Sequence, residues 1–127
     1  MNAYALDMDT TRALGNDMED KAASYLASRG LSLLGRQIRF KRGEIDLLMV
    51  HDNAIVFVEV RYRRHIKLGD GAQSVNWAKR ERLKLAASLW LSQNPQYASL
   101  PCRFDVMSGR GRAESPQWTW YRDAFRT

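Results

Sequence analysis

Two carboxylates occupy neighbouring segments of the chain that have the composition of β-strands. Asp46 lies in residues 44–50 and Glu59 in residues 55–62, and both segments are rich in β-branched and apolar residues. Such segments predict extended strands that are at least partly buried. These two acids are candidates for chemistry, because burying a charge is costly unless a partner compensates it.

The turn between the two strands decides which residues face each other. Residues 52–53 are Asp and Asn, which are typical of a tight hairpin turn. A turn centred there places His51 opposite Ala54, and continuing the antiparallel pairing outward places Asp46 opposite Glu59. Directly opposed residues have Cβ atoms about 4.5–5.5 Å apart. The sequence therefore predicts that the two carboxylates face each other across a hairpin.

Side chains along a strand alternate between the two faces of a sheet. One face of the hairpin should carry both acids together with apolar side chains and one arginine. The residues predicted for this face are Glu44, Asp46, Leu48, Ile55, Phe57, Glu59 and Arg61. The apolar members favour partial burial of the acids. The alternative is an exposed face on which both acids form ordinary surface ion pairs.

Mutual repulsion between the two acids predicts a bound cation. Two ionised carboxylates about 5 Å apart repel each other by about 3 kcal/mol at an effective dielectric constant of about 20. A proton or a cation relieves that repulsion. Mg²⁺ is commonly held by one or two carboxylates, with water and phosphate oxygens completing its coordination. We therefore predict that Asp46 and Glu59 bind Mg²⁺ or Mn²⁺, which could polarise a phosphodiester and lower the pKa of a bound water.

Glu19 is a further acidic candidate, in a helix predicted for residues 16–29. Ala22 and Leu26 define the apolar stripe of this helix, and Glu19 lies on the same face at helical spacing. A carboxylate on a buried stripe needs a partner. The alternative is that Glu19 is a first-turn residue that interacts with the helix dipole.

Two cationic side chains, Arg61 and Lys79, are also candidates. Arg61 should lie opposite Glu44, where it forms either a cross-strand salt bridge or a contact with a bound phosphate. Arginine can stabilise negative charge but is a poor general base. Lys79 lies on the apolar stripe of a helix predicted for residues 72–93. It either reaches the acids or snorkels at the edge of the stripe.

The elements that must position these residues form an α/β pattern. We predict a single domain over residues 1–127, with residues 1–10 a disordered tail. The predicted elements are helices 16–29 and 72–93 and strands 34–41, 44–50, 55–62, 102–108 and 118–125, of which 34–41 is an edge strand. The order α-β-β-β-α-β-β predicts a mixed sheet flanked by helices. The long crossover through the second helix predicts that strand 102–108 runs parallel to its neighbour.

The charge of the chain favours nucleic acid as the partner. The net charge is +6 and the pI about 9.8. Residues 61–84 alone contain eight basic and two acidic residues. A clustered basic segment is suited to phosphate binding, although a solvated basic surface is the alternative. The residues predicted to contact nucleic acid are Arg42, Arg63, Arg64, Lys67 and Arg80, and the loop 63–71 is expected to follow the backbone.

Composition also bears on the compartment. No apolar run approaches the roughly 18–20 residues that a membrane span needs. Residues 1–10 lack a basic start followed by an apolar stretch, so we expect no secretory signal. Cys102 is the single cysteine and cannot form an internal disulfide. We therefore expect a cytoplasmic protein that does not bind membranes.

Two motifs of the chain resemble those of a known family. They are Gly43-Glu44-Ile45-Asp46-Leu47 and Val58-Glu59-Val60-Arg61-Tyr62-Arg63. They resemble the YraN family of uncharacterised bacterial proteins, which is placed in the PD-(D/E)xK nuclease superfamily and is similar to archaeal Holliday-junction resolvases. The first helix with Gly30 after it, the helix with Lys79 and Ala86-Ala87, and Arg103-Phe104-Asp105-Val106 follow in the same order, so the resemblance covers most of the chain.

The resemblance implies a restriction-endonuclease-like fold and assigns roles to the acids. Asp46 and Glu59 match the metal-binding acids, and Glu19 matches the acid of the first helix. The superfamily motif has a lysine two residues after its second acid, where this chain has Arg61. That lysine is thought to position or activate the attacking water, and Lys79 is the candidate replacement.

Three functions remain open at this point. The first is a Mg²⁺- or Mn²⁺-dependent endonuclease that acts on DNA, branched DNA among the candidates. The second is a nuclease-like binding protein that has lost cleavage, which Arg61 favours. The third is an interaction protein that uses its tryptophans, Trp77, Trp118 and Trp120 among them, and a homodimer is also left open.

Overall fold

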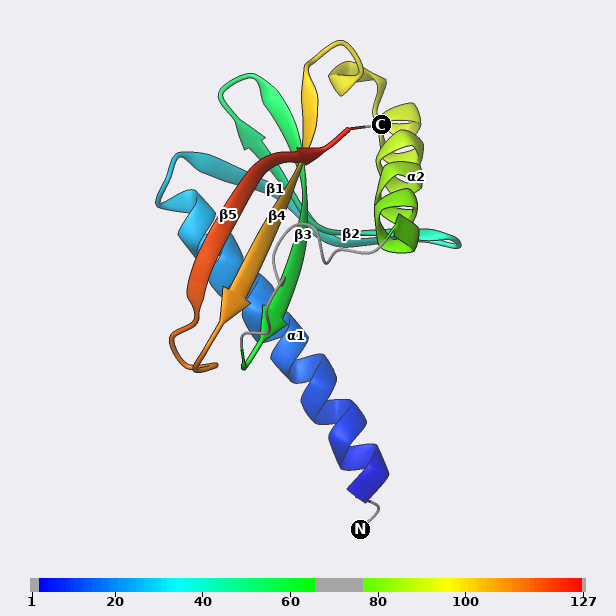
Figure 1. Cartoon of the computed structure of the whole chain (residues 1–127). Coiled ribbons are helices and arrows are strands. Elements are labelled where there is room, and N and C mark those ends of the chain that lie inside the picture. The colour runs from blue at the N-terminus through cyan, green and yellow to red at the C-terminus, as the bar shows by residue number, and fades with distance from the viewer. Residues whose placement is uncertain (1–2, 66–76, 127) are drawn as a thin grey trace.

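The computed structural model describes residues 3–65 and 77–126, with side chains from residue 12 onward in those ranges. Its elements follow the order α-β-β-β-α-β-β that the sequence predicts (Figure 1). They are α1 (Ala3–Ala27), β1 (Leu31–Phe40), β2 (Gly43–His51), β3 (Ala54–Arg63), α2 (Trp77–Gln93), the short 3₁₀ helix η2 (Pro95–Tyr97), β4 (Cys102–Arg110) and β5 (Gln117–Phe125).

The strands form one five-stranded mixed sheet in the order β1-β2-β3-β4-β5. All neighbouring strands are antiparallel except β3 and β4, which run parallel. The parallel direction of β4 follows from the connection through α2, because this helix returns the chain to the end of the sheet at which β3 begins. The predicted parallel strand and the predicted edge position of β1 are both confirmed.

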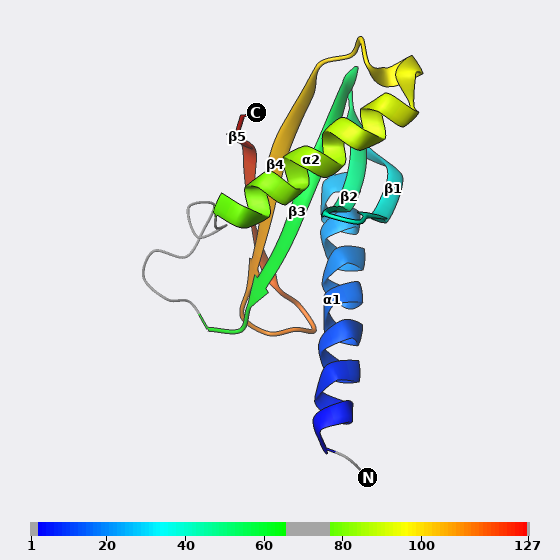
Figure 2. The ribbon, with the colours of Figure 1, turned by 90° about the vertical axis from the view of Figure 1, so that its right-hand side faces the viewer.

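One helix covers each face of the sheet, as Figures 1 and 2 show from two directions. On the α1 side, Ala22 and Leu26 pack against Leu47, Val58 and other strand residues. The α2 side is built from the predicted apolar stripe of that helix, which packs against residues of β2, β3 and β4. The stripe residues Leu83, Ala86, Ala87 and Trp90 are all buried there.

The predicted hairpin register is confirmed over most of its length. Described pairs run from His51 with Ala54 at the turn to Leu47 with Val58. The turn residue Asp52 has φ 55°, a left-handed conformation that Asp and Asn adopt more readily than most residues. The turn chemistry therefore sets the register, as the sequence predicts.

Helix α1 begins at Ala3, whereas we predicted a start near Asn16 and a disordered tail over residues 1–10. The earlier start has a local cause, because residues 3–15 contain several good helix formers and no proline. It also has a tertiary cause. The Asn16 carboxamide accepts a hydrogen bond from Gln37 of β1 instead of capping a helix.

Helix α2 ends at Gln93, as predicted, just before Asn94 and Pro95. Its predicted first turns over residues 72–76 lie outside the described residues. Within the ranges that the structure describes, no helix is long and apolar enough to cross a membrane.

Gly43 sets the spacing between α2 and the start of β2. A Cβ atom at this position would lie 2.5 Å from the Arg82 carbonyl oxygen and 3.1 Å from the Ala86 amide nitrogen. Both are backbone atoms of α2, which cannot move without moving the helix. Glycine is therefore required for the close approach of helix and strand.

We predict that Gly43→Ala destabilises the protein by about 1–3 kcal/mol, because the added methyl group forces α2 away from β2. Urea denaturation followed by circular dichroism measures this change. The matched control is Gly15→Ala in α1, where no atom other than those of the adjacent residues and the local helix backbone lies within 4 Å of the added Cβ. This control should gain about 0.5–1 kcal/mol. Equal stability of the two variants would contradict the proposed packing constraint.

Candidate functional site

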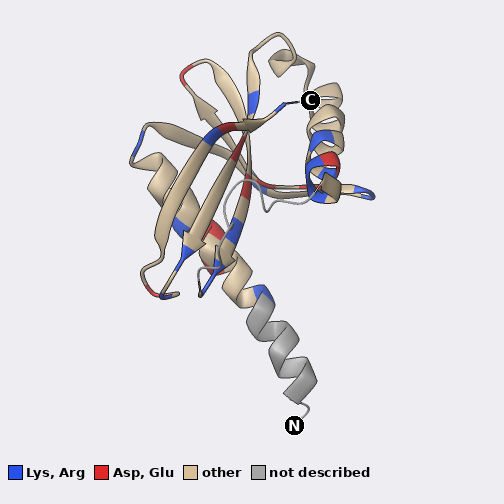
Figure 3. Cartoon of the chain, viewed as in Figure 1, with Lys and Arg blue, Asp and Glu red and all other residues tan. Residues whose placement is uncertain are grey.

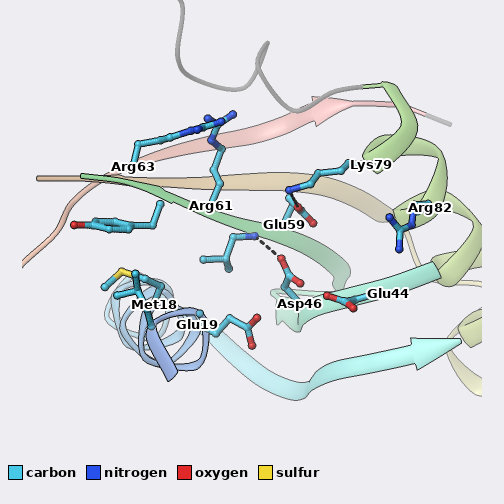
Figure 4. Close-up of a pocket in the computed structure, with 13 residues that line it drawn as sticks. Met18, Glu19, Glu44, Asp46, Glu59, Arg61, Arg63, Lys79 and Arg82 are labelled. Carbon is cyan, nitrogen blue, oxygen red and sulfur yellow. Dashed lines mark hydrogen bonds and ion pairs between the residues drawn. The ribbon is translucent and has the colours of Figure 1, made fainter. Parts of the chain in front are cut away.

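A cleft of about 650 Å³ lies where α1, the start of α2, and the strands β2 and β3 meet (Figure 4). It contains the predicted acids and several basic residues. The lining residues are Leu14, Gly15, Met18, Glu19, Glu44, Asp46, Glu59, Val60, Arg61, Tyr62, Arg63, Lys79 and Arg82.

Asp46 lies at the point where the pairing of β2 with β3 stops. The described ladder ends at Leu47 with Val58, one step before Asp46 would pair with Glu59. The Val60 amide instead donates a hydrogen bond of 2.9 Å to Asp46 Oδ2 (Figure 4). A side-chain oxygen thus accepts from the backbone of β3 at the end of the ladder. The exposed fraction of Asp46 is only 7%.

The predicted alternation of side chains is interrupted at Asp46. Leu48 and Phe57 share the α2 side of the sheet, as predicted, but Ile45 packs in the same cluster. Strict alternation would place Ile45 on the opposite side from Leu48. The irregularity frees the Asp46 carboxylate from the packed core and lets it enter the cleft.

Glu59 enters the cleft from β3 and has a cationic neighbour. Its side chain is 12% exposed, and Lys79 Nζ of α2 lies 3.8 Å from Glu59 Oε1. Lys79 itself is 56% exposed. Of the two alternatives for Lys79, the structure therefore shows the one in which the ammonium group lies beside an acid of the cleft (Figure 4).

Glu19 enters the cleft from α1 and is held by β1. Its side chain is 14% exposed. Gln37 Nε2 donates a hydrogen bond of 2.9 Å to Glu19 Oε1, and Arg36 Nη2 lies 3.6 Å from the same oxygen. Glu19 therefore has tertiary partners and is more than a first-turn residue that interacts with the helix dipole.

Burial raises the pKa of all three acids. It raises the pKa of Asp46 to about 9, and the nearby charge of Glu59 adds to the effect. Burial also raises the pKa of Glu59, although Lys79 opposes the shift. The pKa of Glu19 is raised by burial as well, with the Gln37 hydrogen bond acting in the opposite direction. The cleft therefore concentrates carboxyl groups whose charge is incompletely compensated.

The donor chemistry of the cleft suits a hard divalent cation, because its acidic groups offer carboxylate oxygens. Asp46 and Glu59 are the candidates to hold it. Among the described side chains, no group of three His, Cys, Asp or Glu residues is arranged to hold a metal ion. A cation here would therefore need water or phosphate oxygens in addition to the two carboxylates, which is the usual arrangement for Mg²⁺.

Basic residues occupy the start of α2 and the end of β3, where the ribbon is blue (Figure 3). Arg61, Arg63 and Lys79 line the cleft, as the sequence analysis expected for a phosphate site. Arg61 lies in register with Ser108 of β4, and the ladder that would pair it with Glu44 has already ended. Glu44 instead pairs with Arg39 of β1, with Arg39 Nε 3.6 Å from Glu44 Oε2.

Four other predicted nucleic-acid contacts lie elsewhere or are not described. Arg42 is exposed in the turn between β1 and β2, and Arg64 is exposed just after β3. The guanidinium carbon of Arg80 lies 5.2 Å from the centre of the Phe125 ring, which places that side chain against the core. Lys67 falls outside the described residues.

Arg82 is a cleft residue that was not among the residues predicted from the sequence. Arg82 lines the cleft from α2, three residues after Lys79. Residues three apart lie on the same side of a helix, so the spacing from Lys79 could have identified it. Met18 lines the cleft from α1 and precedes Ala22 by four residues, so helical spacing could have identified it as well. Leu14 had no comparable signal, because its position depends on the earlier start of that helix.

Comparison with known proteins places the chain in a family. The sequence profile of the uncharacterised protein family UPF0102 matches residues 18–108. The chain is 47% identical to a UPF0102 protein of Xanthomonas oryzae pv. oryzae (strain PXO99A), over 88% of this chain and 90% of the relative. It is 44% identical to a UPF0102 protein of Pseudomonas putida (strain GB-1), over 91% of this chain and 94% of the relative. The chain therefore belongs to the uncharacterised protein family UPF0102, the YraN family that its motifs resemble.

Proposed function

We propose that this protein is a Mg²⁺- or Mn²⁺-dependent endonuclease that acts on DNA and has a restriction-endonuclease-like site. One observation carries the proposal. Asp46, Glu59 and Glu19 come from three different elements and gather in one cleft, where burial raises the pKa of each. A fold gains nothing in stability from such a cluster, and perturbed carboxyl groups in a cleft are typical of functional sites.

Asp46 and Glu59 would hold the cation, and Glu19 would orient the remaining water ligands from α1. When bound, the cation polarises a phosphodiester and makes a bound water more acidic. The Asp46 carboxyl group, whose pKa burial raises to about 9, must lose its proton to bind it. The close approach of the two carboxylates is then an advantage, because both charges act on one ion.

Lys79 and Arg61 would complete the site on its solvent side. Lys79 lies beside Glu59 and can donate hydrogen bonds to a water or a phosphate oxygen there. Arg61 follows Glu59 by two residues and stays protonated, so it can stabilise the charge that develops on the phosphate. Lys79 thus takes the role of the lysine that the superfamily motif has where this chain has Arg61.

The surrounding charge supports a nucleic-acid substrate. Arg61, Arg63, Lys79 and Arg82 line the same cleft as the acids. Cationic side chains bind the phosphates of a nucleic acid and release condensed counterions. DNA cleavage needs this combination, because the backbone must be held while one phosphodiester meets the cation.

A second function, binding without cleavage, is favoured by Arg61 in place of the superfamily lysine. In that case the acids and the basic residues would recognise nucleic acid by charge and shape alone. An interaction surface for protein is favoured by Trp77, which is 75% exposed at the start of α2. The salt dependence of binding distinguishes these possibilities, because the affinity of a protein for the phosphates of a nucleic acid falls steeply as the salt concentration rises.

We predict that the metal-free protein loses stability as the pH rises from about 5 to 8.5. Asp46 keeps its proton in the folded state up to a pKa of about 9, whereas the unfolded chain releases it near 3.8. The folded state therefore binds more protons in this range, and raising the pH favours unfolding. Asp46→Asn should remove at least about 1 kcal/mol of this pH dependence. Urea titrations at both pH values measure it, and an unchanged slope in the variant would contradict the prediction.

We predict that wild-type protein binds Mn²⁺ with release of protons, and that Asp46→Asn and Glu59→Gln each weaken binding at least about tenfold. Isothermal titration calorimetry in two buffers with different ionisation enthalpies measures both quantities. Glu81→Gln is the matched control, because Glu81 is an α2 carboxylate that is not part of the cleft lining. Its Oε1 atom lies 3.1 Å from Lys84 Nζ. Absence of binding in the wild type, or equal loss in the control, would reject the metal site.

We predict that wild-type protein with Mn²⁺ cleaves at least one member of a panel of single-stranded, duplex, flap and four-way DNA. Glu59→Gln and Lys79→Ala should each slow cleavage at least about a hundredfold. Glu81→Gln should leave the rate unchanged. If the wild type binds the DNA without cleaving it and Arg61→Lys creates cleavage, the natural protein is a binding protein.

A further inference from the structure

Gln37 has an unfavourable backbone conformation in the middle of an edge strand. Its φ is 50°, although it lies within β1 and is not glycine. Regular strands have strongly negative φ, and a bulky residue in the left-handed region needs compensating contacts. The described pairing of β1 with β2 includes Arg36 with Leu47 and Ile38 with Ile45. The row between them, which contains Gln37 and Asp46, is skipped.

This irregular row changes the directions of the neighbouring side chains. Arg36 contacts α1 through Asp20, while Ile38 packs against the cluster on the α2 side. In a regular strand Gln37 would point to the α2 side, opposite to Arg36. Instead its side chain reaches α1, so two successive residues of β1 face the same helix. The left-handed conformation of Gln37 is what allows this arrangement.

The Gln37 side chain contacts Glu19, the acid that α1 contributes to the cleft. Its Nε2 donates hydrogen bonds to Asn16 Oδ1 and, at 2.9 Å, to Glu19 Oε1. Arg36 lies farther from Glu19, at 3.6 Å, and its Nη1 is engaged by Asp20. The nearest hydrogen-bond donor to Glu19 among these groups is therefore a neutral amide.

We propose that Gln37 is a positioning residue, whose carboxamide holds the Glu19 carboxylate toward Asp46 and Glu59. The proposal rests on the proposed metal-dependent function of the cleft. A neutral donor is suited to this task, because it fixes the direction of a carboxylate without cancelling the negative charge that attracts a cation. An arginine or lysine at the same distance would compete with the cation for that charge.

A purely structural brace between β1 and α1 is the rival interpretation, and the backbone conformation separates the two. Gln37→Gly removes the carboxamide and also removes the steric cost of a positive φ. Asp52→Gly is the matched control, because Asp52 has a φ of 55° in the exposed hairpin turn and lies outside the cleft lining. Both variants relieve backbone strain, but only Gln37→Gly of the two changes the surroundings of Glu19.

The first readout is the ¹³C resonance of the Glu19 carboxyl carbon at fixed pH in metal-free protein. We expect it to shift in Gln37→Gly and to stay unchanged in Asp52→Gly. Gln37→Met provides a second variant, which keeps the length of the side chain but lacks the N–H donor, and it should shift the resonance in the same direction. An unchanged resonance in both Gln37 variants would overturn the proposal. This readout needs neither metal nor DNA, so it tests Gln37 even if the proposed function fails.

The second readout is Mn²⁺ affinity in a double-mutant cycle. Gln37→Gly should weaken binding about tenfold, as expected for a residue that orients a group of the site. If Gln37 acts through Glu19, the double variant with Glu19→Gln should bind no more weakly than Glu19→Gln alone. Additive losses would show that Gln37 acts independently of Glu19 and would overturn the positioning role. Absence of Mn²⁺ binding in the wild type would reject the proposed function instead, and leave the Glu19 resonance to decide on Gln37.

Discussion

The hydrogen bond from the Val60 amide to Asp46 marks the place where the sheet opens. Up to Leu47 and Val58 the two central strands satisfy each other's backbone groups, and beyond them a carboxylate oxygen accepts from β3. Substituting a side-chain acceptor for a backbone carbonyl lets β2 and β3 separate without leaving the Val60 amide unsatisfied. The cleft depends on this separation, because α1 and α2 then line it from the two sides of the sheet.

The buried acids of this fold differ in how fully neighbouring hydrogen-bond donors and cations compensate them. Asp105 is fully buried on β4, and its carboxylate accepts hydrogen bonds from Arg103, from Trp120 Nε1 at 2.9 Å and from the Asp123 amide at 2.9 Å. Such a carboxylate is surrounded by donors, as a structural buried charge must be. The fold is thus able to compensate a buried carboxylate. In the cleft, by contrast, Glu59 has a lysine at 3.8 Å that is itself largely in solvent.

The parts of the structure that the sequence predicts correctly depend on short-range rules. The Asp-Asn turn determines the pairing of His51 with Ala54, and helical spacing determines that Leu83 and Trp90 are buried. The parallel direction of β4 follows from the length of the crossover. The cleft could be anticipated in part, because the register brings Asp46 and Glu59 to the same end of the hairpin and the spacing of the helix brings Lys79 near them.

The parts that differ from prediction depend on contacts between distant segments. Nothing in the local sequence around Gln37 indicates a left-handed residue in a strand, because its cause is α1, about twenty residues earlier in the chain. The same contact explains why Asn16 lies inside α1 and does not cap it. Periodicity describes one element at a time, so it does not predict where two elements distort each other.

All three layers of the molecule contribute charged side chains to the cleft, and this makes its geometry sensitive to packing far from the acids. The sheet supplies Asp46 and Glu59, α1 supplies Glu19, and α2 supplies the cations Lys79 and Arg82.

The distance between Lys79 and Glu59 is therefore fixed by how closely α2 approaches the sheet. That approach is tight at Gly43, where the backbone of α2 leaves no room for a Cβ atom. Coulomb energy varies inversely with distance, so a displacement of α2 by a few tenths of an ångström alters the interaction of Lys79 with Glu59 only slightly. The hydrogen bond from Lys79 to a reacting water that we propose would be more demanding, because hydrogen bonds weaken steeply as their geometry departs from the optimum. In the proposed mechanism, the glycine at the start of β2 would therefore serve the positioning of Lys79 more than the electrostatics of the cleft.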